Sequence, residues 1–121
     1  MQNKLIRRIY KQGDIIWVRF PFSDKPDKAR VRPAIVVSNR KSNKLDNDLL
    51  ICPITTTLRD TPFSFVINIS DVTISLPEKS EIRCNKIYTL RNYFVISKLS
   101  YLKKDKHRLL IDKIYSCIKN N

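Results

Sequence analysis

The stretch 30-RVRPAIVVSN-39 decides how this chain begins to fold, because it joins a charged approach to an almost unbroken apolar run. Residues 33–39 are rich in β-branched side chains, which favour a buried strand. Pro33 fixes its own φ and pushes Arg32 toward an extended conformation. The guanidinium is therefore aimed by the backbone at the mouth of the strand. At this position Arg32 is either a solvated loop residue or a residue positioned to act on a substrate.

Further strand signals surround this stretch, each bounded by polar residues or by a proline, where a missing N–H does no harm. The last segment changes to helical spacing from Lys103 onward, with an apolar stripe formed by Leu110, Ile111, Ile114, Cys117 and Ile118. The pattern predicts a mainly β fold, a small barrel or sandwich of about seven short strands with a C-terminal helix. The predicted strands are 14–20, 33–39, 48–55, 63–69, 72–76, 81–90 and 93–99.

The composition favours one soluble domain with an anionic partner. The chain has 121 residues and 42% hydrophobic residues, which predicts a single domain over 1–121 with a basic N-terminal extension over 1–12. It carries 24 Lys+Arg against 11 Asp+Glu, a formal charge of +13, which indicates nucleic acid, an anionic membrane or an acidic protein as partner. No apolar run approaches the ~20 residues of a membrane span. The N-terminus lacks the features of a secretory signal, so we expect a cytoplasmic protein.

Several classes of chemistry are disfavoured by residue counts. Gly13 is the only glycine, which removes Gly-rich phosphate loops. The three cysteines are far apart and lie in apolar segments, so we expect small buried hydrophobic residues. With His107 as the only histidine, a zinc site has too few ligands. We therefore predict neither a metal nor a cofactor, and scattered carboxylates argue against a hydrolase built on paired acids.

What remains is arginine and hydroxyl chemistry at strand ends. Arg32 stands at the entry to the strand 33–39, and 52-CPITTT-57 places the hydroxyls of Thr55 and Thr56 where a strand ends. In 82-IRCNK-86, alternation along a strand would put Arg83 and Asn85 on one face. Arginine binds phosphate through a planar fork, and hydroxyls can donate to an oxyanion. Each motif alone is more often a solvated edge or turn, so the functional interpretation depends on their combination.

These motifs together resemble the MazF/PemK (Kid) family of bacterial toxins, sequence-specific endoribonucleases of type II toxin–antitoxin modules. The resemblance runs from Gly13 to the C-terminal helix, through "GDIIWVRFPFSD", "RVRPAIVVSN", "ICPITT", "SEIRCNKIYTL" and "SYLKKD". It implies an SH3-like barrel, a homodimer, and a cognate acidic antitoxin that covers the active site. It also implies metal-independent cleavage of single-stranded RNA. In that reaction the ribose 2′-OH attacks the adjacent phosphate and leaves a 2′,3′-cyclic phosphate and a 5′-OH.

Matched residue by residue, the resemblance implies that Arg32, Thr55 and Arg83 are catalytic and that Thr56 supplies the following hydroxyl. Two departures concern the proton acceptor. Asn85 stands where the PemK/Kid branch has an aspartate, and the histidine of that branch's first loop is absent. In addition, Ser100 stands where the family usually has glycine.

The first loop and its surroundings supply the expected contacts to RNA. Basic residues there attract the phosphate backbone, and aromatic or polar groups can read unpaired bases. Phe20 and Tyr88 are further aromatic candidates, and core packing is an equal alternative for Phe20. Two other functions remain open, a non-catalytic nucleic-acid-binding module and an interaction protein for an antitoxin. The predicted substrate-binding residues are Phe22, Lys25, Lys28, Arg30, Thr56 and Asn85, with Arg40, Lys41 and Lys44 flanking them.

Overall fold

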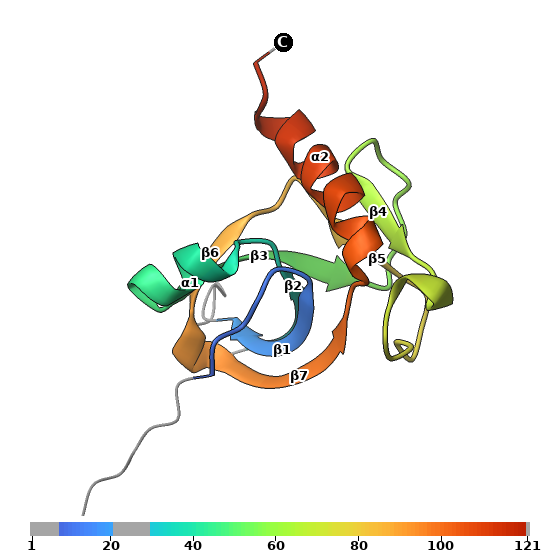
Figure 1. Cartoon of the computed structure of the whole chain (residues 1–121). Coiled ribbons are helices and arrows are strands. Elements are labelled where there is room, and N and C mark those ends of the chain that lie inside the picture. Colours follow the sequence, from blue (N-terminus) through green and yellow to red (C-terminus); the bar gives the residue numbers. More distant parts are fainter. Residues whose placement is uncertain (1–7, 21–29, 121) are drawn as a thin grey trace, which may run out of the picture.

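A computed structural model describes residues 8–20 and 30–120 (Figure 1). Seven antiparallel strands form one sheet in the order β4-β5-β3-β2-β1-β7, with β6 paired to β3. This confirms the expected mainly β fold, a small barrel-like sheet with a C-terminal helix. The elements are β1 Asp14–Phe20, β2 Arg30–Val36, α1 Arg40–Asp46, β3 Asp48–Thr55, β4 Ser64–Ile67, β5 Ser80–Arg83, β6 Tyr88–Arg91, β7 Val95–Tyr101 and α2 His107–Ile118, with 3-10 turns at Ile69–Asp71, Asn92–Phe94 and Lys104–Lys106.

The long strand β3 organises the sheet, because it has partners along both of its edges. Residues 48–51 of β3 pair with β6, its end at Ile54 and Thr55 pairs with β5, and its middle pairs with β2. The pairing of β1 with β7 shifts register twice, after Ile15 and after Trp17. Such irregularities increase twist, so they help the sheet to curl into the rounded shape visible in Figure 1.

Two buried clusters explain why the central strands read as apolar runs. The first cluster, on the side covered by α2, contains Ile15 and Ile54 together with Leu110 and Ile114 of the helix. The second cluster contains Ile16 and neighbouring side chains on the opposite face of the sheet. Because successive strand residues point to opposite faces, burial of both faces requires apolar residues at nearly every position.

Several predicted strands differ from the structure. The strand predicted at 33–39 is β2, Arg30–Val36, so Arg32 lies inside the strand and not at its entry. The strand predicted at 63–69 is shorter, and the one predicted at 93–99 begins and ends two residues later.

Two other segments differ more. Residues 72–76 form no strand; Val72 makes an isolated bridge to Leu102, and the Ser100 side chain replaces the ladder by accepting from Ile74 N–H at 2.9 Å and donating to Ile74 O at 2.7 Å. Ser100, which stands where the resembled family usually has glycine, therefore has a structural role. The predicted strand 81–90 is interrupted by a turn at residues 84–85, so it becomes β5 and β6.

The polar connection after β2 contains the short helix α1, which the sequence pattern did not predict. Asn39 caps its start by accepting a 2.9 Å hydrogen bond from Ser42 N–H, and Asn47 ends it in the left-handed conformation at φ 57°. Both are strong local signals for a helix end. Asn43 is buried and donates to Tyr10 O at 2.8 Å, which anchors the helix to the segment before β1. Within the described part of the chain, no helix has the length and apolar character needed to span a membrane.

The cysteines are all free thiols, and two of them are buried as predicted. Burial raises the pKa of both Cys52 and Cys84 to about 12, so these thiols stay protonated and unreactive at neutral pH. Cys117 on α2 is half-buried and donates to Cys84 O at 3.6 Å.

Gly13 occupies a position that an L-residue would strain. Its φ is +96°, and an added Cβ would collide with the His107 imidazole, which is itself 2.7 Å from Leu102 O. We expect Gly13→Ala to lower the free energy of unfolding by about 1–3 kcal/mol from backbone strain, with the collision adding to this. Urea unfolding of Gly13→Ala and of Gly13→Ala/His107→Ala would separate the two causes. An unchanged midpoint for Gly13→Ala would contradict the expectation.

Candidate active site

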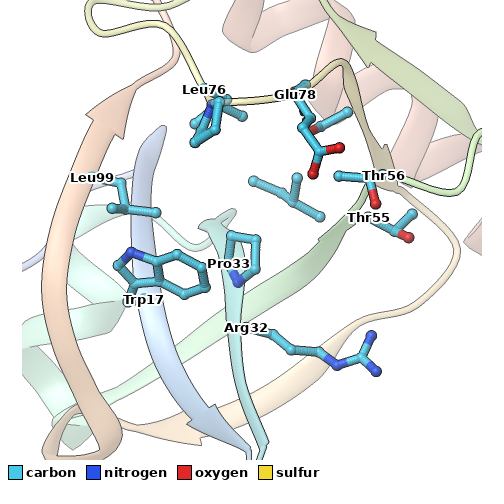
Figure 2. A pocket seen from close by; sticks show the side chains of 11 residues that line it. Trp17, Arg32, Pro33, Thr55, Thr56, Leu76, Glu78 and Leu99 are labelled. Atoms are coloured by element: carbon cyan, nitrogen blue, oxygen red, sulfur yellow. Dashed lines mark hydrogen bonds between the residues drawn. The ribbon is translucent and has the colours of Figure 1, made fainter.

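A pocket of about 240 Å³ opens at one end of the sheet, where β2 and β3 meet the loop before β5 (Figure 2). One side of it is apolar and the other carries hydroxyl and charged groups. The apolar side includes Trp17, Pro33, Leu76 and Leu99, and the polar side includes Arg32, Thr55, Thr56 and Glu78. Its volume lies below the ~300–1,000 Å³ usual for sites that enclose a small molecule. The pocket therefore fits part of a larger substrate better than an enclosed ligand.

Arg32 lies at the pocket because of its place in β2. Pro33 pairs with Trp17 of β1 and lines the pocket, while Arg32, one residue earlier, is exposed and its side chain extends along the rim (Figure 2). Within the described residues, no hydrogen bond or ion pair engages the guanidinium. The charge is therefore available to an anion that enters the pocket.

Thr55 and Thr56 reach the same pocket from the end of β3. The Thr55 Oγ1 accepts a 3.1 Å hydrogen bond from the backbone N–H of Thr57, which fixes the position of that oxygen. Its hydroxyl proton remains free to be donated. The structure thus brings together three of the residues that the sequence singled out, Arg32, Thr55 and Thr56.

Arg83 has a different environment from Arg32. Its Nε lies 3.1 Å from Glu81 Oε2, its Nη2 donates to Thr57 O at 3.1 Å, and its side chain is only 11% exposed. Arg83 is absent from the pocket lining, and so is Asn85, which is exposed in the turn after β5. The predicted shared strand face for Arg83 and Asn85 is wrong, because the strand ends at Arg83.

Glu81 is the fully buried centre of a network behind the pocket. Besides Arg83, its carboxylate accepts from Arg59 N–H at 2.9 Å, from Asp60 N–H at 3.5 Å and from Ser64 Oγ at 2.8 Å. Burial by itself would raise the pKa of Glu81, but these hydrogen bonds and the Arg83 charge lower it below its ordinary value. The network ties the segment after Thr55 to β4 and β5.

The predicted RNA contacts are only partly described. Arg30 is exposed at the start of β2, whereas Phe22, Lys25 and Lys28 lie outside the described residues. Phe20 is buried in the second cluster and stacks edge-to-face on Tyr88, with ring centroids 5.8 Å apart. The basic residues Arg40, Lys41 and Lys44 are exposed on α1.

Sequence reasoning did not place Trp17 or Glu78 in the site. Trp17 is half-buried on β1, and both of its neighbours on the strand are fully buried. Alternation along the strand could have predicted that Trp17 points to the other face from those neighbours. Glu78 lies in a loop without regular structure, and no local pattern predicts which surface such a loop approaches. Its place in the pocket follows only from the folded chain.

The fold and the site together define a small barrel-like β protein with an arginine and hydroxyl pocket at strand ends. Residues 11–118 match the profile of the PemK-like, MazF-like toxins of type II toxin–antitoxin systems. This chain belongs to that family. Comparison with curated protein sequences finds no significant match.

Solved structures show the same fold at low sequence identity. The chain is similar to MazF from Deinococcus radiodurans, with 18% identity over 92% of this chain and 97% of that one, at a TM-score of 0.73. It is also similar to the Mycobacterium tuberculosis toxin MazF-mt6, with 18% identity over 89% and 98%, at a TM-score of 0.71. A MazE–MazF structure from D. radiodurans, with 18% identity over 92% and 97%, gives a TM-score of 0.75.

Proposed function

We propose that this protein is a toxin that cleaves single-stranded RNA without a metal ion, through attack of a ribose 2′-OH on the adjacent phosphate. The observation that carries the proposal is the shared pocket, which Arg32 lines together with Thr55 and Thr56 and in which its guanidinium has no bonding partner among the described residues. The products would be a 2′,3′-cyclic phosphate and a 5′-OH. Membership of a toxin family supports the activity, and the pocket supports the residues.

Arg32 and Thr55 act on the reacting phosphate in this proposal. Negative charge builds on the non-bridging oxygens during attack, and groups already aimed at those oxygens stabilise it most. The planar guanidinium of Arg32 can bind two of them at once. Thr55 donates its hydroxyl proton to one of them or orients the 2′-OH. The second hydroxyl, on Thr56, binds the substrate from the same wall.

Arg83 contributes from outside the pocket, and we assign it a positioning role in place of direct contact. It bonds to Thr57 O and to Glu81, and Thr57 N–H in turn bonds to the Thr55 hydroxyl. Arg83 therefore fixes the backbone that presents Thr55. Asn85, exposed in the neighbouring turn, remains available to contact an RNA that extends beyond the pocket.

The partners follow from charge and from the family. With 13 more basic than acidic residues, the chain attracts an anionic polymer, so affinity for RNA should fall steeply with salt. The same charge suits an acidic antitoxin, and the related structures include a MazE–MazF structure. We propose a cytoplasmic homodimer that binds single-stranded RNA when free and a cognate acidic antitoxin when inhibited.

End-mapping of RNA incubated with purified protein tests the proposal. We expect cuts at a recurring short sequence in unpaired RNA, with cyclic phosphate at the 3′ ends and free 5′-OH groups. Cleavage should persist in EDTA. Binding without cleavage would favour the non-catalytic module, and loss of cleavage in EDTA would contradict the mechanism.

A further inference from the structure

The proposed reaction needs a group that takes the proton of the attacking 2′-OH, and the sequence motifs leave that group unidentified. Arg32 cannot take this proton, because a guanidinium carries only N–H donors and has no acceptor atom. The hydroxyls of Thr55 and Thr56 are weak bases, and the amide of Asn85 cannot accept the proton. Among the described residues that line the pocket, Glu78 is the only carboxylate.

The loop that carries Glu78 is fixed on both sides. Upstream, Ser100 Oγ holds both backbone groups of Ile74, at 2.9 and 2.7 Å. Downstream, Ser80 Oγ donates to the backbone oxygen of Glu78 itself at 2.9 Å. Pro77, directly before Glu78, restricts the backbone further and also lines the pocket. These contacts fix the place from which the Glu78 side chain projects.

Glu78 also differs from three buried acids of the described chain in having no bonding partner. Asp14 lies 3.0 Å from Lys98 Nζ, and Asp71 accepts from Asn68 N–H at 2.9 Å. Glu81 is occupied by its network. By contrast, no hydrogen bond or ion pair to another group engages the Glu78 carboxylate within the described part of the chain.

The direction of the side chain fits a role in the pocket. Figure 2 shows the Glu78 carboxylate projecting into the open space from the loop, on the side where Thr55 and Thr56 lie. Arg32 reaches the same space from β2 and is the only other charged residue that the described pocket lining contains. A phosphate bound in the pocket would lie beside the Arg32 guanidinium on one side. The ribose next to that phosphate would lie beside the Glu78 carboxylate on the other side.

We propose that Glu78 is the general base of the cleavage reaction, an inference that rests on the proposed function. The Glu78 carboxylate takes the proton of the 2′-OH while the O2′–P bond forms. The P–O5′ bond breaks, and the departing 5′ oxygen takes a proton from water. Glu78 then returns its proton to solvent, so that the carboxylate is restored for the next cycle.

The test compares Glu78→Gln with Asp112→Asn, a matched loss of one negative charge at an exposed position on α2. Single-turnover cleavage is measured beside the affinity for a 2′-deoxy RNA analogue, which binds but has no nucleophile. We expect Glu78→Gln to slow cleavage by about 100-fold or more, the usual contribution of a general base. Its affinity should be unchanged or slightly higher, and Asp112→Asn should cleave like wild type.

Chemical rescue makes the base role specific. Formate should restore cleavage by Glu78→Ala in proportion to its concentration and should not speed cleavage by Arg32→Ala. Wild-type cleavage by Glu78→Gln would overturn the inference alone. A parallel loss of RNA affinity, or a failure of formate to rescue Glu78→Ala, would overturn it too. If wild-type protein cuts no RNA, the proposed function falls and the inference falls with it.

Discussion

Replacing Arg32 with alanine is expected to slow RNA cleavage by about 10³-fold, the upper end of what removal of one preorganised oxyanion contact costs. The fold should survive, because Arg32 is exposed and its guanidinium has no bonding partner among the described residues. Arg32→Lys keeps the charge but loses the two-pronged fork, so an intermediate rate is expected. Single-turnover cleavage with thermal unfolding as a companion measurement checks both statements.

Arg30→Ala is the matched control for this experiment. Arg30 lies two residues away on the same strand, is likewise exposed, and is not among the described residues that line the pocket. Its loss should weaken RNA affinity modestly and reduce the salt dependence, without a comparable effect on the bound-state rate. If Arg30→Ala and Arg32→Ala proved equivalent, Arg32 would be one more electrostatic contact. A folded Arg32→Ala protein that cuts at the wild-type rate would end the mechanism.

The sequence predicted β1 and β3 well for a physical reason, whereas β2 lies three residues earlier than predicted. The bounds of β1 and β3 agree with the predicted segments 14–20 and 48–55, because burial of both faces produces apolar runs that few other structures tolerate. The segment 72–76 was misjudged because its backbone partner is a side chain, that of Ser100. A pattern of local alternation carries no information about a partner 26 residues away.

The site residues that could be predicted from the sequence are those that lie on a strand or directly after one. Arg32 lies in the first half of β2, and Thr55 and Thr56 lie at the end of β3. The antiparallel pairing of the two strands brings these parts together. The partner of Arg83 could also have been foreseen, because Glu81 lies two residues earlier on the same strand and alternation puts both side chains on one face. Glu78 could not, since its approach to the pocket depends on the path of an irregular loop.

Replacing Glu81 with alanine is expected to lower the free energy of unfolding by about 3–5 kcal/mol, the usual cost of removing one partner of a buried ion pair. The change would leave Arg83, 11% exposed, without its anion, and would leave the N–H groups of Arg59 and Asp60 without an acceptor. Glu81→Gln keeps the shape and loses only the charge, so a smaller loss is expected. Urea unfolding at neutral pH checks the order of the two variants.

The dependence of stability on pH should also differ between the wild-type protein and the Glu81 variants. The pKa of Glu81 is lowered on folding, so its contribution to stability is fully present above the pKa of an unfolded glutamate. That contribution disappears as the pH falls through the lower pKa of the folded state, whereas Glu81→Gln lacks this part of the dependence. Glu78→Ala is the control, since loss of an exposed carboxylate with no partner among the described residues should change stability little. Equal stability losses for Glu81→Ala and Glu78→Ala would show that the buried network does not hold the Thr55 end of β3 in place.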